Sequence, residues 1–77
     1  MEYFIVANSK AAPMVSDQSN HFAEAGSPKD ALLRVIHSYS HPAGFYSASV
    51  WSDANSYHKH EKPLLTCVEV QGRIYYS

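Results

Sequence analysis

One stretch of the chain carries both the start and the stop signals of a single α-helix. Ser27 suits the capping position, and Pro28 suits the first helical position, where its missing N–H leaves no hydrogen bond unmade. Apolar residues then recur at the spacing of one helical face: Leu32, Val35, Ile36 and Tyr39. Pro42 disfavours helical geometry in the residue before it, and Gly44 suits the turn that follows. The pattern predicts a helix over about residues 28–40 that packs one face on a sheet.

Short runs of strand-forming residues surround this helix. They occupy residues 3–7, 21–25, 45–51, 64–70 and 73–76. The run 3–7 is apolar at every position, which is typical of a strand covered on both faces and therefore interior to its sheet. In the run 45–51, alternation places Tyr46 on the same face as Ala48 and Val50.

The order of these elements predicts an α+β domain. A short helix over about residues 53–60, stopped before Pro63, precedes the last two strands. The expected architecture has two layers, with a four- to five-stranded, mostly antiparallel sheet and the order β-β-α-β-(α)-β-β. One long helix covers only one face of such a sheet. The second face then needs a cover from the polar segment 8–20 (where Met14-Val15 could form a brief strand), from the short helix or from another chain. A symmetric dimer is the most frequent solution, so we expect a homodimer.

The chain is short and contains one cysteine. Its 77 residues predict a single domain, 1–77, and a domain of this size buries only about 60% of its unfolded surface. Cys67 has no partner for a disulfide, which fits a reducing compartment. No apolar run approaches the roughly 18 residues of a membrane span, and the run 3–7 is too short for a signal peptide. These observations predict a cytoplasmic protein with no membrane association.

Charge is balanced in this sequence. Six Lys and Arg residues stand against seven Asp and Glu residues, so the basic face of a nucleic-acid-binding protein is not expected. One alternative is a weak RNA-binding module, in which aromatic side chains on an open sheet stack on bases. The candidates for this role are Phe45, Tyr46, Tyr75 and Tyr76. The charge balance favours the simpler interpretation that these rings pack in a core or against a partner.

Five histidines raise the question of a metal site. His37 and His41 are four residues apart on the expected helix, and with Asp30 and Arg34 they fall on the face opposite the apolar stripe. The other candidate ligands are His58, His60 and Cys67. Their spacing matches no zinc module, and histidines in the last turn of a helix are explained by its dipole. We predict no metal and no cofactor.

A second alternative is a small hydrolase or isomerase with histidine as its general base. The candidate bases are His41, His58 and His60, and Asp53 or Glu61 would orient them. The chain has no glycine-rich phosphate loop and no nucleophile elbow. We therefore assign no catalytic residue, and an enzyme is the less favoured class.

The densest polar and aromatic segment of the chain is 57–63, which connects two expected strands and is expected to border the turn 42–44. The binding residues assigned on this basis are His41, Tyr57, His58, Lys59 and His60. The expected dimer or partner surface consists of strand aromatics: Tyr46, Trp51, Tyr75 and Tyr76. The sequence thus predicts a small binding or regulatory protein that acts through protein–protein interaction as a homodimer. A solvated connector is the alternative interpretation of segment 57–62.

The start of the expected helix is similar to that of a known family. The residues SPKDAL (27–32) follow an expected strand and resemble the corresponding part of the small α+β domain of HicB-type antitoxins. The chain lacks the glycine-rich hairpin and the DNA-binding segment of that family. The resemblance therefore concerns local structure, and no function is taken from it.

Overall fold

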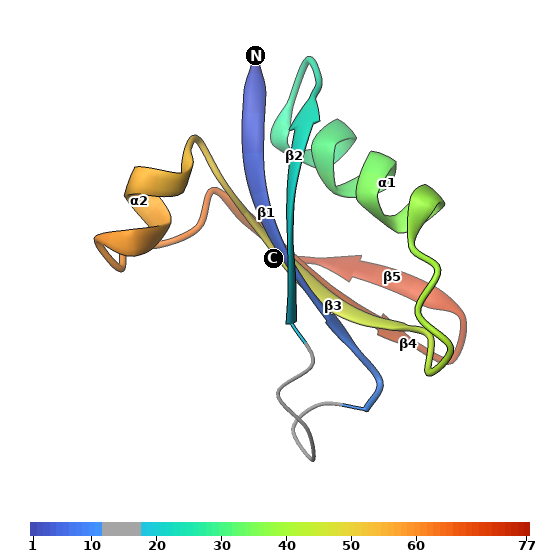
Figure 1. Cartoon of the computed structure of the whole chain (residues 1–77). Helices are drawn as coiled ribbons and strands as arrows, with labels where there is room; N and C mark the ends of the chain where they lie inside the picture. The colour runs from blue at the N-terminus through green and yellow to red at the C-terminus, as the bar shows by residue number, and fades with distance from the viewer. Residues whose placement is uncertain (12–17) are drawn as a thin grey trace.

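The computed structural model describes residues 1–11 and 18–77 and shows an α+β fold with a five-stranded antiparallel sheet (Figure 1). Its elements are β1 (Glu2–Ser9), β2 (Gln18–Glu24), α1 (Pro28–Ser38), β3 (Phe45–Trp51), α2 (Ala54–His58), β4 (Leu65–Val70) and β5 (Arg73–Tyr76). This order confirms the predicted fold class, and β3 and β5 have the predicted bounds. The brief strand considered at Met14-Val15 lies outside the described residues. None of the helices in the described ranges is long and apolar enough to cross a membrane.

The strands are arranged in the order β2-β1-β3-β4-β5. β1 pairs with β2 on one side and with β3 on the other, so it is an interior strand, and its residues Tyr3 to Ala7 are all buried, as expected from the sequence. β2 and β3 both run antiparallel to β1 and are therefore parallel to each other. The α1 helix connects them by crossing over one face of β1, since it contacts all three strands.

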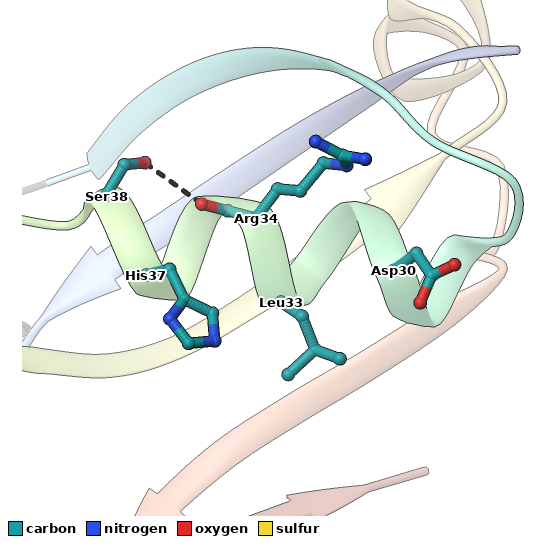
Figure 2. Close-up of a pocket in the computed structure, with 5 residues that line it drawn as sticks. All are labelled: Asp30, Leu33, Arg34, His37 and Ser38. Atoms are coloured by element: carbon teal, nitrogen blue, oxygen red, sulfur yellow. Dashed lines mark hydrogen bonds between the residues drawn. The ribbon is translucent and has the colours of Figure 1, made fainter.

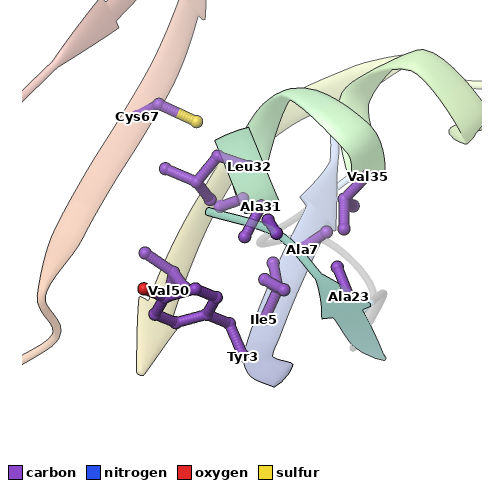
Figure 3. Close-up of a cluster of buried hydrophobic side chains, with 11 residues drawn as sticks. Tyr3, Ile5, Ala7, Ala23, Ala31, Leu32, Val35, Val50 and Cys67 are labelled. Atoms are coloured by element: carbon purple, nitrogen blue, oxygen red, sulfur yellow. The ribbon is translucent and has the colours of Figure 1, made fainter. Parts of the chain in front are cut away.

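The hydrophobic core lies between α1 and the sheet (Figure 3). Leu32 of α1 is completely buried, and so are Ile5 of β1 and Val50 of β3, which lie opposite each other. The other buried members of this cluster are Tyr3, Ala7, Ala23, Ala25, Ala31, Val35, Ala48 and Cys67. Five of these are alanines, whose small side chains let the helix approach the sheet closely.

The α1 helix ends at Ser38 and not at residue 40 as predicted. Tyr39 has extended geometry, with φ −69° and ψ 127°, and its ring packs edge-to-face on Phe45 at a centroid distance of 5.5 Å. The last residue of the apolar stripe thus reaches the core by leaving the helix. His41 lies beyond the helix as a result, so the predicted helical pair of His37 and His41 is wrong.

A β-bulge changes the side-chain alternation at the start of β3. The register between β1 and β3 shifts between Asn8 and Ser9, so that Ser9 lies opposite Phe45. Phe45 packs against the core, whereas Tyr46 is 44% exposed. The prediction that Tyr46 shares a face with Ala48 is therefore wrong, because the extra residue in β3 reverses the side-chain alternation between Ser47 and Phe45.

The α2 helix lies on the other side of the sheet from α1 and covers one end of that face (Figure 1). There Phe22, Phe4 and Trp51 lie opposite one another on β2, β1 and β3. Tyr57 of α2 packs on Phe4 and Trp51, at ring distances of 5.2 and 4.9 Å. Polar residues share the rest of this face with apolar ones. The polar residues are Gln18, Asn20, Asn8, Ser47, Ser49 and Thr66, and the apolar ones include Val6, Val68 and Tyr75. Val6 is only 4% exposed, so the second face is buried in part, as the apolar run 3–7 predicts.

Candidate functional site

The turn formed by α2 and the residues after it, 53–61, is called the α2 corner below. Its helix begins where Asp53 caps it, with the carboxylate accepting a hydrogen bond from the Ser56 N–H at 2.7 Å. This hydrogen bond is the main reason why the pKa of Asp53 lies below its usual value. The helix covers Ala54–His58, which is shorter than the predicted 53–60 because Asp53 and Lys59 act as its caps.

The α2 helix ends in a left-handed cap centred on His60. The His60 N–H donates to the Tyr57 carbonyl at 3.0 Å, and the Glu61 N–H donates to the Ser56 carbonyl at 3.1 Å. This pair of hydrogen bonds is the Schellman arrangement, which requires a positive φ at its central residue. His60 has a φ of 60°, at a position that glycine usually occupies.

Side-chain contacts hold the α2 corner against the sheet. The indole Nε1–H of Trp51 donates to the Glu61 carbonyl at 2.8 Å. Tyr57 is half-buried between the rings of Phe4 and Trp51. The middle of the turn, at Tyr57, therefore contacts β1 and β3, and its last residue, Glu61, is hydrogen-bonded to β3.

This attachment leaves three consecutive side chains of the α2 corner, His58, Lys59 and His60, in solvent. Lys62 follows, and Glu61 is the only acid among residues 58–62. A rigid turn that presents a Lys and two His side chains suits an acidic group on a binding partner. Four of the five predicted binding residues therefore lie together: Tyr57, His58, Lys59 and His60.

His41, the fifth predicted binding residue, lies elsewhere. It precedes β3, whereas the α2 corner follows β3, so the two are separated by the length of a seven-residue strand, about 20 Å. The His41 Nδ1 accepts a hydrogen bond from the Ala43 N–H at 3.0 Å, and this hydrogen bond stabilises the turn before β3. That turn borders Lys10, whose N–H donates to the Gly44 carbonyl at 2.9 Å. The expectation that segment 57–63 borders residues 42–44 is therefore wrong, because antiparallel pairing of β3 and β4 places them at opposite ends.

The four aromatic residues predicted as a partner surface do not form one surface. Tyr46 and Tyr75 are exposed, whereas Trp51 belongs to the contacts of the α2 corner. Tyr76 packs against the core on the α1 side, and the Lys29 ammonium lies 4.9 Å from its ring centroid. Burial raises the pKa of the Tyr76 hydroxyl. Tyr76 is thus separated from Tyr75, because neighbours in one strand point to opposite faces, whereas the strand register places Tyr75 and Trp51 on the same face.

A shallow pocket lies on the solvent side of α1 (Figure 2). All its lining residues belong to this one helix: Asp30, Leu33, Arg34, His37 and Ser38. Three of them, Asp30, Arg34 and His37, were predicted to share the face opposite the apolar stripe. The Ser38 hydroxyl donates to the Arg34 carbonyl at 3.1 Å. Because no second element among residues 1–11 and 18–77 supplies a lining residue, α1 alone would hold a ligand there.

Sequence reasoning passed over one serine–histidine pair. Ser19 Oγ and His21 Nε2 are 2.7 Å apart on β2, and the spacing of two residues on a strand is the signal that could have found them. Catalysis by such a pair also needs a group that orients the histidine. Within residues 1–11 and 18–77, no carboxylate hydrogen-bonds to His21, and no group of three or more His, Cys, Asp and Glu residues is placed to hold a metal ion. Cys67 is 3% exposed, and burial raises the pKa of its thiol.

No protein-family model, no curated protein and no solved structure matches the chain.

Proposed function

We propose that this protein acts by binding another protein through the α2 corner and that it does so as a homodimer. The observation that carries the proposal is the rigid attachment of an otherwise exposed turn. Trp51 and Tyr57 hold the turn to the sheet, and His58, Lys59 and His60 face solvent. A turn that is already ordered loses little conformational freedom on binding, which favours affinity.

The chemistry of the turn indicates the kind of partner. Residues 58–62 carry two lysines and two histidines against one glutamate. An acidic segment of a partner protein would complement this charge. Because His58, Lys59 and His60 are already exposed, the partner could reach them without a rearrangement of the turn. We therefore propose an acidic protein surface as the binding partner.

The alternative catalytic site receives no support from this geometry. It offered His41, His58 or His60 as the general base, with Asp53 or Glu61 to orient it. Within residues 1–11 and 18–77, neither carboxylate hydrogen-bonds to His58 or His60, and His41 lies at the far end of β3. A general base and the group that assists it must lie within hydrogen-bond reach of the same substrate. Binding therefore accounts for the α2 corner better than acid–base chemistry does.

The test is comparative affinity capture from the native host, with the tagged full chain as bait and mass spectrometry as the readout. One bait carries His58→Ser, Lys59→Ser and His60→Gly, and the control bait carries Asp30→Ser and His37→Ser on the outer side of α1. We expect the wild type and the control to capture the same acidic proteins and the α2-corner variant to lose them. Equal capture by all three baits, with equal melting temperatures, would contradict the proposal.

A further inference from the structure

Among residues 1–11 and 18–77, β2 and β5 are the edge strands of the sheet, and they differ in character. β5 is a four-residue strand that contains Arg73, and short length and charge are the usual protections of an edge. β2 is seven residues long, contains neither proline nor lysine, and has its only charged side chain in its last residue, Glu24. In the part of the chain that the structure describes, β2 pairs only with β1, so its outer backbone groups can pair with another strand.

The pairing of β2 with β1 determines which β2 groups point outward. The Ala25 N–H donates to the Met1 carbonyl at 3.0 Å, so Ala25 directs its backbone groups toward β1. Along an antiparallel strand, this direction alternates from residue to residue. The backbone groups of Glu24, Phe22 and Asn20 therefore point to the free edge.

Phe22 is the most unusual side chain on this strand. It is 62% exposed, although it lies opposite Phe4 and meets that ring edge-to-face at 5.2 Å. The aromatic row that begins at Trp51 and continues through Phe4 thus ends at the free edge with a ring that is mostly in water. An exposed large apolar side chain at an unprotected edge indicates an interaction site.

We infer that two copies of this chain pair through β2 in antiparallel orientation, with Phe22 of one copy opposite Phe22 of the other. In this register Asn20 of each copy lies opposite Glu24 of the other, so an amide meets a carboxylate. The outward backbone N–H and C=O groups of residues 20, 22 and 24 then form the hydrogen bonds between the two copies. The two five-stranded sheets become one continuous sheet.

The register follows from the side chains that would meet. A shift of two residues in one direction places Phe22 opposite Asn20, and a shift in the other direction places it opposite Glu24. Either shift leaves the ring against a polar group, whereas the symmetric register buries both rings together. The Phe22 pair therefore selects one register.

A second copy fits this edge better than an unrelated strand does. A two-fold axis pairs the unprotected edge of each copy with that of the other, and the outer edges of the dimer are then the two protected β5 strands. Such a dimer is closed, which prevents further edge-to-edge growth. This inference rests on the homodimer in the proposed function and adds its interface.

The first test measures the dimer dissociation constant of the full chain by sedimentation equilibrium. Asn20→Pro removes an outward N–H that takes no part in the β1 ladder, and Phe22→Ser removes the central ring. We expect Asn20→Pro to be monomeric and Phe22→Ser to raise the dissociation constant at least about 30-fold. Val70→Ser is the matched control, because Val70 is an apolar residue that is 48% exposed on β4, at the other end of the strand order, and should leave the constant unchanged.

The second test examines the register by disulfide cross-linking. Directly opposed residues of a hydrogen-bonded pair have Cα atoms about 5.5 Å apart, which suits a disulfide. Phe22→Cys should therefore cross-link two copies after treatment with diamide. Asn20→Cys should not, because its two copies would be offset by four residues, about 13 Å.

The outcomes separate this interface from dimerisation as such. A dimer that survives Asn20→Pro and Phe22→Ser and does not cross-link at position 22 would overturn the interface while leaving the homodimer intact. A chain that is monomeric at all concentrations would overturn both. Loss of the dimer in these two variants, with unchanged circular dichroism, and a cross-link at position 22 would establish the interface.

Discussion

The backbone of His60 is the residue-scale feature that most distinguishes the α2 corner. A residue with a Cβ loses roughly 1 kcal/mol or more in the left-handed region, where glycine is unstrained. The hydrogen bonds of the cap, with the Trp51–Glu61 contact beside them, hold His60 in this conformation. Strain that a fold retains in an exposed turn is consistent with a role for that side chain.

Replacing His60 by glycine tests this strain. We expect His60→Gly to raise the free energy of unfolding by about 1 kcal/mol, because glycine adopts the left-handed conformation without a Cβ clash. His58→Gly is the control, since it places glycine inside α2, where it should cost about 1 kcal/mol. Urea denaturation followed by tryptophan fluorescence measures both. Equal destabilisation by the two variants would show that His60 carries no strain.

At the scale of elements, the two ends of α1 have different origins. Its start is local, because the Ser27 hydroxyl accepts the Asp30 N–H at 3.2 Å and Pro28 takes the first helical position. Its end is tertiary, because Tyr39 leaves the helix to pack on Phe45. The sequence therefore predicted the first end correctly and placed the second too late.

The cap at the start of α1 provides an element-scale prediction. Ser27→Ala removes the acceptor for the Asp30 N–H and should lower the free energy of unfolding by about 1 kcal/mol. Ser40→Ala, which alters an exposed serine beyond the helix, should have little effect. Urea titration of both variants measures the difference. An unchanged midpoint for Ser27→Ala would mean that packing alone determines where α1 begins.

At the scale of the whole molecule, one ion pair joins three distant segments. The Lys10 ammonium lies 2.6 Å from Glu69 Oε2, and Glu69 Oε1 accepts the Gly72 N–H at 2.9 Å. The Lys10 N–H also donates to the Gly44 carbonyl. The end of β1, the turn before β3 and the turn between β4 and β5 are thereby connected.

This ion pair predicts a dependence of stability on pH. The hydrogen bond from Lys10, followed by that from the Gly72 N–H, holds the pKa of Glu69 below its usual value. A carboxyl whose pKa is lower in the folded state adds stability above its unfolded pKa of about 4.3, and this contribution is lost as the pH falls through the folded pKa. Glu69→Gln should therefore flatten the loss of stability below pH 5. Glu61→Gln, outside this contact, is the control, and chemical denaturation at a series of pH values measures the slopes. Parallel slopes for wild type and Glu69→Gln would contradict the prediction.

Much of the fold could be predicted because its signals act over a few residues. The cap at Ser27, the helical spacing from Leu32 to Ile36 and the turn at Gln71-Gly72 each depend on neighbours in the chain. The unbroken apolar run 3–7 likewise predicted β1 as an interior strand, and all five residues are buried. These features determine the type of each element and the α+β class.

The candidate site depended on contacts that no local pattern contains. Antiparallel pairing of β3 and β4 separated His41 from the α2 corner. The bulge at Tyr46, opposite the step from Asn8 to Ser9, turned Phe45 toward the core, because one added residue reverses the alternation at that end of β3. The sequence by itself determined which elements form. Only the tertiary structure decided where α1 ends, which strands adjoin and which residues share a surface, because burial and strand pairing act between segments far apart in the chain.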